Sequence, residues 1–422
     1  MRIGDALWRR RVAVGATGVL LAGFLLTSFV IVPAITHRGW QYPSDIWSNY
    51  QLAHNISLGD YPYIYFQASL VASPAFLLVL VPLEFVTRHL GMTTGFGIAI
   101  PHPSAWPVVA PVVVLLSSTA LFADDSLADH LGADARARMV MGLAGAVALG
   151  SVVWWGHPED AIAVAFLLYA VRAVFGGRWI RAAWLLGFGV AFQPLIALAI
   201  PAVLLPVGWR RLPASVVRVV VPTALLLALP LLKDPSDTVR AVVQQPVFPA
   251  LSRPTVWMHL APSIADQVGN HGQSVAGGPV RVVSALLAVA IGLWYLRRAP
   301  RPEVLVWCVT LTLAFRYLFE PGVEPYYAWP ALAVGLLGSA VWRSRVRLWW
   351  VAGAAAVLTW VVNVRVHTGW LWWPSALLLL VYVTMVAPPH LLARLPPEVG
   401  ADGDSDNVGS PSTPMTVAPT DP

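Results

Sequence analysis

The sequence predicts an all-α fold, a polytopic membrane bundle of about twelve transmembrane helices with a further membrane-lying helix in the first outer loop. Three observations predict it: the composition, a series of apolar runs, and the distribution of arginine. Of the 422 residues, 57% are hydrophobic and only 11% are charged, and the mean hydropathy is +0.68. This composition is too apolar for soluble domains and is typical of a protein whose solvent is the bilayer.

The apolar runs are candidates for spanning or half-spanning helices. The first run, residues 12–35, is long enough to cross about 30 Å of hydrocarbon and lacks a small-residue cleavage site. It therefore predicts a retained helix and not a signal peptide. Several other runs are shorter than the roughly 20 residues of a full span. These other runs are 106–123, 139–155, 161–175, 182–193, 195–208, 215–232, 279–296, 303–319, 326–342, 348–365 and 370–388.

A further apolar segment, Ala68–Val86, determines on which side of the membrane each later loop lies. If this segment lies on or dips into the outer face, nineteen of the 27 basic residues fall on the side of the N-terminus. If it spans, every later loop inverts and most arginines lie outside, contrary to the positive-inside bias. We therefore expect both termini inside and a membrane-lying helix at 68–86. The eight basic residues left elsewhere are Arg38, Arg88, Lys233, Arg240, Arg253, Arg281, Arg316 and Arg365.

The chain divides into a membrane domain, residues 1–390, and a tail, residues 391–422. The tail is rich in Pro, Ser, Thr, Gly and Asp, which cannot bury apolar surface, so it predicts a disordered cytoplasmic segment. Within the membrane domain, Gln193-Pro194 breaks one long apolar stretch into two half-helices, an arrangement tolerated at membrane depth where it lines a cavity. A single cysteine, Cys308, excludes an intramolecular disulfide and a cysteine-based metal cluster.

This topology gathers nearly all of the polar aromatic material on the outer face, in segments 36–105, 154–161, 233–278 and 320–327. In the first of them, Asp45 precedes a stretch with helical spacing. Two interpretations remain open. Asp45 could cap that helix, a role worth ~1 kcal/mol. Alternatively, it is a partly desolvated carboxylate whose raised pKa lets it accept a proton from an alcohol.

The second outer turn places His157, Glu159 and Asp160 around a proline that opens the next helix. Proline and two acids are what a helix N-terminus favours through its free N–H groups and dipole. That explanation does not account for His157 or for Trp154-Trp155 beside it. An apolar wall next to titratable groups is suited to holding a sugar acceptor.

Arg316 lies near the outer end of the run 303–319, inside apolar sequence. A cation there is costly and indicates a partner such as a phosphate or a carboxylate. Pairing with Glu320, four residues later, or snorkelling would satisfy it without any ligand. Tyr326 and Tyr327 follow in the next turn, where they are substrate-binding candidates or part of an interfacial aromatic belt.

The loop 233–278 carries His259 and His271, which could bind an anionic head group or simply form solvated surface. We find no Walker loop, dinucleotide fingerprint, HExxH or nucleophile elbow, which argues against ATP, NAD, zinc-protease or serine-hydrolase chemistry. The pI near 9.7 comes largely from arginines in short loops. It therefore indicates membrane topology and contact with anionic lipids, and not nucleic acid.

Taken together, these motifs resemble the integral-membrane glycosyltransferases of the GT-C superfamily. Asp45, followed by a short helix and the element Gly59–Tyr63, carries most of the resemblance. The sequence is most similar to bacterial polyprenyl-phosphate-mannose-dependent mannosyltransferases, over roughly residues 12–390. It departs from them in its His-Pro-Glu-Asp turn and in having only one acid at the first-loop site. Further matching features are the membrane-lying helix at 68–86, Glu159, Asp160, Gln193-Pro194 and Pro325–Tyr327.

The resemblance implies the transfer of a hexose, mannose by analogy, from a polyprenyl-phosphate donor to a glycan or glycolipid acceptor, with inversion. Asp45 would be the catalytic base, and Arg316 with His259 or His271 would stabilise the leaving phosphate. No cofactor is implied, and a divalent metal is neither required by this chemistry nor excluded. The expected location is the outer face of the plasma membrane. A bacterial source is expected because lysine is almost absent in favour of arginine, as in GC-rich bacterial genomes.

Two other classes of function remain. A secondary transporter or a flippase of lipid-linked sugars would place ionisable groups near the bilayer midplane and would contain inverted repeats. The carboxylates of this chain instead cluster at outer helix ends, which favours an outward-facing enzyme. A structural partner in an envelope assembly would require only that the outer loops bind protein.

Overall fold

The computed structural model describes residues 8–66, 73–94, 100–247, 253–265, 271–297, 301–363 and 372–392. The chain forms two compact units, Met1–Ala387 and Pro388–Pro422. In the second unit the described part contains the short helix α18 (Pro389–Leu392). The predicted tail, residues 391–422, therefore lies outside the described residues apart from its first two positions. The first unit carries all of the candidate site residues.

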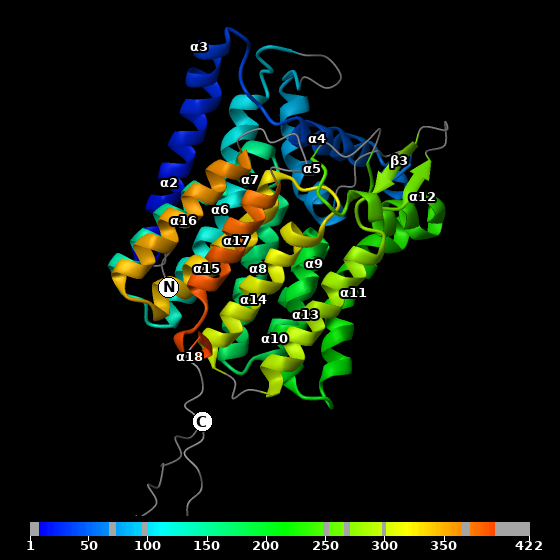
Figure 1. Ribbon diagram of the computed structural model, residues 1–422. Coiled ribbons are helices and arrows are strands. Elements are labelled where there is room, and N and C mark those ends of the chain that lie inside the picture. Colours follow the sequence, from blue (N-terminus) through cyan, green and yellow to red (C-terminus); the bar gives the residue numbers. More distant parts are fainter. Residues whose placement is uncertain are drawn as a thin grey trace, which may run out of the picture. The chain divides into compact units, whose positions relative to one another are not determined.

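The first unit begins with one long apolar helix, drawn in dark blue in Figure 1. Its parts are α2 (Arg11–Leu26), a π-helical turn η1 (Thr27–Ile31) and α3 (Val32–Thr36). The helix ends at His37, which adopts a left-handed conformation with φ 51°. The loop predicted to lie outside then contains α4 (Ser44–Ser57), the 3₁₀ turn η2 (Tyr61–Tyr63) and α5 (Pro74–His89).

The segment expected to lie on the membrane corresponds to α5. This helix begins six residues later than the predicted segment 68–86 and extends to His89, while residues 67–72 lie outside the described part. At 16 residues it is too short to be a candidate span. Its position on the membrane surface stays a prediction.

The middle of the chain folds into helices that run back and forth through the bundle. The break after Gln193 is present as expected: α9 ends at Phe192, and a 3₁₀ turn follows it. The elements are α6 (Trp106–His130), α7 (Ala135–Trp155), α8 (Pro158–Phe175), α9 (Trp179–Phe192), η3 (Pro194–Ala199), α10 (Ile200–Leu204), η4 (Leu205–Val207), α11 (Leu212–Lys233), α12 (Pro235–Val239) and η5 (Arg240–Gln244).

The loop 233–278 holds a small antiparallel sheet that the sequence analysis did not predict. Its strands are β1 (Pro246–Val247), β2 (Ser263–Ala265) and β3 (His271–Ser274), in the order β1-β3-β2. Pro246 pairs with Ser274 and Ser263 with Gln273. The strands are too short and too polar to show the alternation of apolar and polar residues by which a strand is predicted from sequence. A 3₁₀ turn, η6 (Met258–Leu260), precedes β2.

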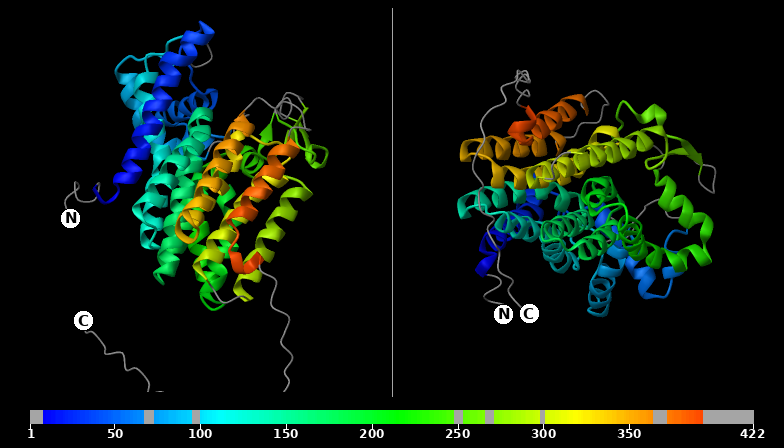
Figure 2. Two further views of the ribbon diagram at one scale, coloured as in Figure 1. Left: turned by 60° about the vertical axis from the view of Figure 1, so that its left-hand side comes forward. Right: turned by 90° about the horizontal axis from the view of Figure 1, so that it is seen from below.

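The last part of the unit adds helices along one side of the α6–α11 group, as both views of Figure 2 show. Buried α15 packs against α7 and α14, and nearly all of its residues from Trp329 to Ala340 are inaccessible. These elements are α13 (Pro279–Arg297), α14 (Pro302–Phe319), η7 (Pro325–Ala328), α15 (Trp329–Trp342), α16 (Arg345–Asn363) and α17 (Trp372–Val386).

Where the structure describes them, the predicted apolar runs coincide with helical structure. In the described part of the chain, seven helices are long and apolar enough to cross a membrane. They are Arg11–Thr36, Trp106–His130, Ala135–Trp155, Leu212–Lys233, Pro279–Arg297, Pro302–Phe319 and Arg345–Asn363. The prediction of a helical membrane protein is thus confirmed, while the count of about twelve spans stays a prediction.

Candidate functional site

A glycine brings the first loop and the second outer turn together. Gly156, at the end of α7, has φ +77°, a left-handed conformation that side chains with a Cβ rarely adopt. A Cβ at this position would lie 2.8 Å from Pro43 Cβ and 3.1 Å from the Ile46 backbone nitrogen. Only glycine therefore lets the turn between α7 and α8 approach the start of α4, where Asp45 lies in the first helical turn.

His157, the residue after Gly156, lies between two carboxylates. Its Nε2 is 2.9 Å from Asp45 Oδ2, and its Nδ1 is 2.7 Å from Glu159 Oε1. Each ring nitrogen must carry a proton to donate to a carboxylate, so the arrangement favours the imidazolium form. Asp45 also accepts a hydrogen bond from the Ser44 hydroxyl, at 3.0 Å.

The contacts of His157 and Asp45 explain how the pKa of each group is shifted. Burial lowers the pKa of His157, but the charge of Glu159 and hydrogen bonds to both carboxylates outweigh burial and raise it to about 10. Burial raises the pKa of Asp45, but the hydrogen bond and the charge of His157 bring it below its usual value. The expectation of a raised Asp45 pKa was therefore wrong, because a cation 112 residues away in sequence lies next to it.

Asp45 does not cap its helix in the described structure. No described hydrogen bond joins its carboxylate to a backbone N–H, and its partners are Ser44 and His157. Pro158, by contrast, occupies the first turn of α8 as expected, with His157 at the N-cap position.

A second group of polar residues surrounds Asp160. Arg316 Nη1 lies 3.0 Å from Asp160 Oδ2, and the Gln193 amide nitrogen lies 2.5 Å from Asp160 Oδ1. The side chain of Asp160 is fully buried and that of Arg316 is 7% exposed. The break in the helix at Gln193-Pro194 thus delivers an amide to a buried ion pair. The Arg316 Nε is 3.9 Å from Glu320 Oε1 and, among the described residues, has no hydrogen-bond partner.

Two tyrosines connect these groups. The guanidinium of Arg316 lies over the ring of Tyr327, 3.5 Å from its centroid, and 5.8 Å from the centroid of Tyr326. Tyr326 also stacks on His157, with 4.1 Å between ring centroids. The Asp45–His157–Glu159 and Asp160–Arg316 groups therefore form one continuous cluster of charged and aromatic side chains.

Two arginines complete the cluster: Arg253, whose loop was predicted to bind an anionic head group, and Arg281, which was assigned to no site. Arg281 Nη1 lies 3.1 Å from Glu320 Oε1. Arg253 forms an ion pair with Glu324, and its guanidinium lies 4.3 Å from the centroid of the Trp155 ring. A signal for both existed in the sequence, since they belong to the eight basic residues that the predicted topology does not place on the side of the N-terminus.

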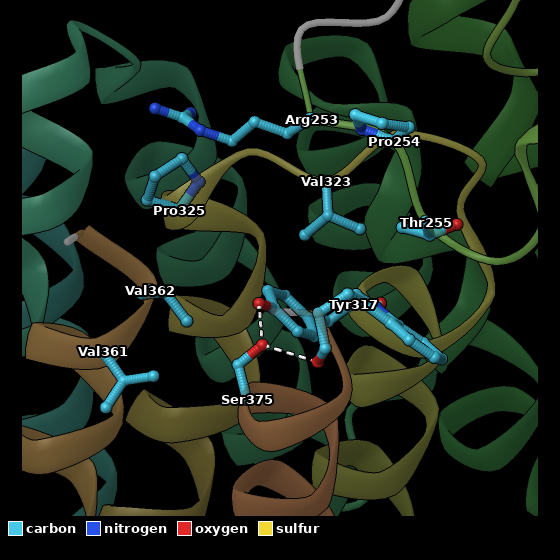
Figure 3. Close-up of a pocket in the computed structure, with 10 residues that line it drawn as sticks. Arg253, Pro254, Thr255, Tyr317, Val323, Pro325, Val361, Val362 and Ser375 are labelled. Carbon is cyan, nitrogen blue, oxygen red and sulfur yellow. Dashed lines mark hydrogen bonds between the residues drawn. The ribbon is translucent and has the colours of Figure 1, made fainter. Parts of the chain in front are cut away.

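A small pocket of about 30 Å³ adjoins the cluster through Arg253. Figure 3 shows the Arg253 side chain near Pro325 above the pocket and the Tyr317 hydroxyl facing Ser375 below it. The two oxygens are 2.6 Å apart, and the Ser375 hydroxyl donates to the Trp372 carbonyl at 2.8 Å. The volume suits water and not a sugar ring.

The remaining predicted site residues lie apart from the cluster. His259 and His271 are exposed, on η6 and β3, and no described contact connects them with Asp45 or Arg316. In the described ranges, no group of three or more His, Cys, Asp or Glu side chains is arranged to hold a metal ion. The other nine predicted site residues all belong to the cluster or contact it directly, namely Asp45, His157, Glu159, Asp160, Gln193, Arg316, Glu320, Tyr326 and Tyr327.

The fold and the site together define a helical membrane protein with a buried ion pair and an accessible carboxylate in one cluster. Neither models of known protein families nor curated protein sequences give a match to this chain. The function must therefore be argued from the cluster itself.

Proposed function

We propose that this protein is an integral-membrane hexosyltransferase that moves a sugar, mannose in our proposal, from a polyprenyl phosphate to a glycan or glycolipid. We place the reaction at the outer face of a bacterial plasma membrane. The observation that supports this most directly is the state of Asp45. Its side chain is 33% exposed, the most exposed of the carboxylates in the cluster, and the neighbouring His157 keeps it ionised at neutral pH.

In this mechanism Asp45 accepts the proton of an acceptor hydroxyl. A carboxylate has about four lone-pair sites. Its hydrogen bonds with Ser44 and His157 therefore leave room for a third donor. The hydroxyl oxygen forms a bond to the anomeric carbon while the bond from that carbon to the phosphate oxygen breaks. The electron pair leaves with the polyprenyl phosphate, and the configuration inverts.

The leaving phosphate gains charge and needs a fixed cation nearby. Arg316 supplies it in our proposal. Asp160 and Tyr327 hold the guanidinium in place, and its Nε still has a proton to donate. Arg281 pairs with Glu320, and Arg253 pairs with Glu324. His259 and His271, with no described contact to the cluster, are not required for this step.

The test uses membranes from cells that make the full chain, incubated with a radiolabelled mannosyl polyprenyl phosphate. Transfer of label to a glycan or glycolipid fraction should depend on the protein. Asp45→Asn should reduce the rate by about 100-fold or more, because general-base catalysis contributes at least that much. Asp129→Asn, which removes a carboxylate outside the cluster, should leave the rate nearly unchanged.

Two results would contradict the proposal. Asp45→Asn could retain transfer near the wild-type rate while Glu159→Gln is inactive, which would move the base to the second outer turn. Alternatively, labelled donor could cross sealed vesicles without any transfer of sugar, which would favour a flippase.

A further inference from the structure

A second site lies at the end of the bundle opposite the charged cluster. Helix α8 starts at the cluster with Pro158, and α9 returns to it at Gln193, so the turn between them is distant. Along α9 this separation is about 21 Å, at 1.5 Å per residue. A groove of about 900 Å³ opens there between the first halves of α9 and α11, which lie side by side in Figure 1.

The backbones of α9 and α11 lie in close contact at the level of Gly187. A Cβ on Gly187 would lie 2.7 Å from the Arg218 carbonyl oxygen and 2.8 Å from that of Val219. The missing side chain therefore allows the backbones to meet at this level. The groove beside this contact is lined by Trp184, Phe188 and other apolar side chains.

The edge of this groove is strongly basic. Five arginines line it, and no described ion pair joins any of them to a carboxylate. Residues 161–233 contain no Asp or Glu at all, so this part of the chain cannot neutralise them. Because α9 and α11 both begin here, the positive ends of two helix dipoles add to the same field. The arginines are Arg178, Arg181, Arg210, Arg211 and Arg218.

From these observations we propose that the groove binds an anionic phospholipid of the membrane. The arginines would hold the phosphate of the head group, and one acyl chain would lie on the exposed rings of Trp184 and Phe188. Trp179 and Trp209 mark the same level, and tryptophan is enriched where a membrane meets water. The apolar volume is far larger than a free phosphate needs, so the ligand carries a hydrocarbon part.

The lipid site is independent of the proposed sugar transfer, since it shares no residue with the charged cluster. Binding is measured on the full chain in detergent by native mass spectrometry. The probes are dioleoyl phosphatidylglycerol and dioleoyl phosphatidylcholine, which have the same acyl chains, together with glycerol 3-phosphate as a free head group. Phosphatidylglycerol should bind at least about tenfold more tightly than phosphatidylcholine, given the gain of about 1 kcal/mol per basic residue near an anionic surface. Glycerol 3-phosphate should compete weakly.

Matched variants distinguish lipid binding in the groove from a general effect of positive charge. Arg210→Gln/Arg211→Gln should abolish most of the preference for phosphatidylglycerol. Arg136→Gln/Arg297→Gln removes the same charge from exposed arginines outside the groove and should retain it. Ala214→Trp fills the groove without changing charge, at an exposed position that tolerates a larger side chain, and should also weaken binding.

The inference is overturned if wild-type protein binds the two lipids equally. It is also overturned if the control pair of arginines matters as much as the groove pair, or if glycerol 3-phosphate competes as well as the intact lipid.

Discussion

The Nε2 of His157 lies 2.9 Å from Asp45 Oδ2, although 112 residues separate the two in sequence. This contact favours the charged form of both groups, and Glu159 contributes to the raised pKa of His157. It also connects the first outer loop to the turn that opens α8. Three predictions concern this contact and those around it, and a fourth concerns the topology.

Removing the His157 charge should change how stability depends on pH. The pKa of His157 rises from 6.5 to about 10 on folding. Its contribution to the free energy of unfolding is therefore complete below pH 6.5 and is lost as the pH rises towards 10. The stability difference between wild type and His157→Gln should be largest below pH 6.5 and should shrink at alkaline pH. Thermal unfolding in detergent across this range measures it.

His259→Gln is the matched control, since His259 is exposed and has no described contact with the cluster. A pH-independent difference for His157→Gln would show that the imidazole contributes packing with Tyr326 and not charge.

The Asp160–Arg316 pair should behave as a coupled unit. Removing one partner of a buried ion pair leaves the other unpaired and costs about 3–5 kcal/mol. Asp160→Asn and Arg316→Met should therefore each destabilise the protein strongly. The double variant should be less destabilised than the two effects added together, because neither charge remains. Unfolding of all four proteins by denaturant completes the cycle, and additive effects would refute the coupling.

Gly156→Ala tests whether the glycine aligns Asp45 with His157. The left-handed conformation alone costs an alanine roughly 1–2 kcal/mol. Its Cβ would also press on Pro43, at 2.8 Å, and displace the start of α4. We expect lower thermal stability together with a loss of sugar transfer. Gly150→Ala is the control, since a Cβ at this position in α7 has no atom within 4 Å. Equal effects at both glycines would argue against a specific role for the turn.

The topology can be tested with single cysteines in a Cys308→Ala background. Leu58→Cys and Leu260→Cys lie on the expected outer side, and Arg210→Cys and Val346→Cys on the inner side, all at exposed positions. An impermeant thiol reagent should label the first two in intact cells and the last two only after permeabilisation. Labelling of Arg210→Cys from outside would invert the arrangement.

Much of the local structure could be predicted from the chain alone. Apolar runs mark the helices because the bilayer requires apolar side chains and internally satisfied backbone groups. Gln193-Pro194 ends α9 since proline cannot continue a helix, and Pro158 with two acids opens α8. The isolation of Arg316 in apolar sequence indicated a partner. Each of these signals involves residues close to one another in sequence, so their spacing and chemistry are enough to predict the local structure.

The partners were decided by the tertiary structure. Arg316 lies closer to Asp160, 156 residues away and at 3.0 Å, than to Glu320, which follows the end of its own helix and is 3.9 Å away. Spacing along the helix favours Glu320, but α14 packs against η3, which also contacts α8, and this packing places Asp160 closer to the guanidinium. The lowered pKa of Asp45 also depends on the tertiary structure. Burial of Asp45 could be inferred from the sequence, but the neighbouring cation, His157, could not. Distances between residues far apart in the chain depend on how the helices pack. That packing cannot be read from local patterns in a single sequence.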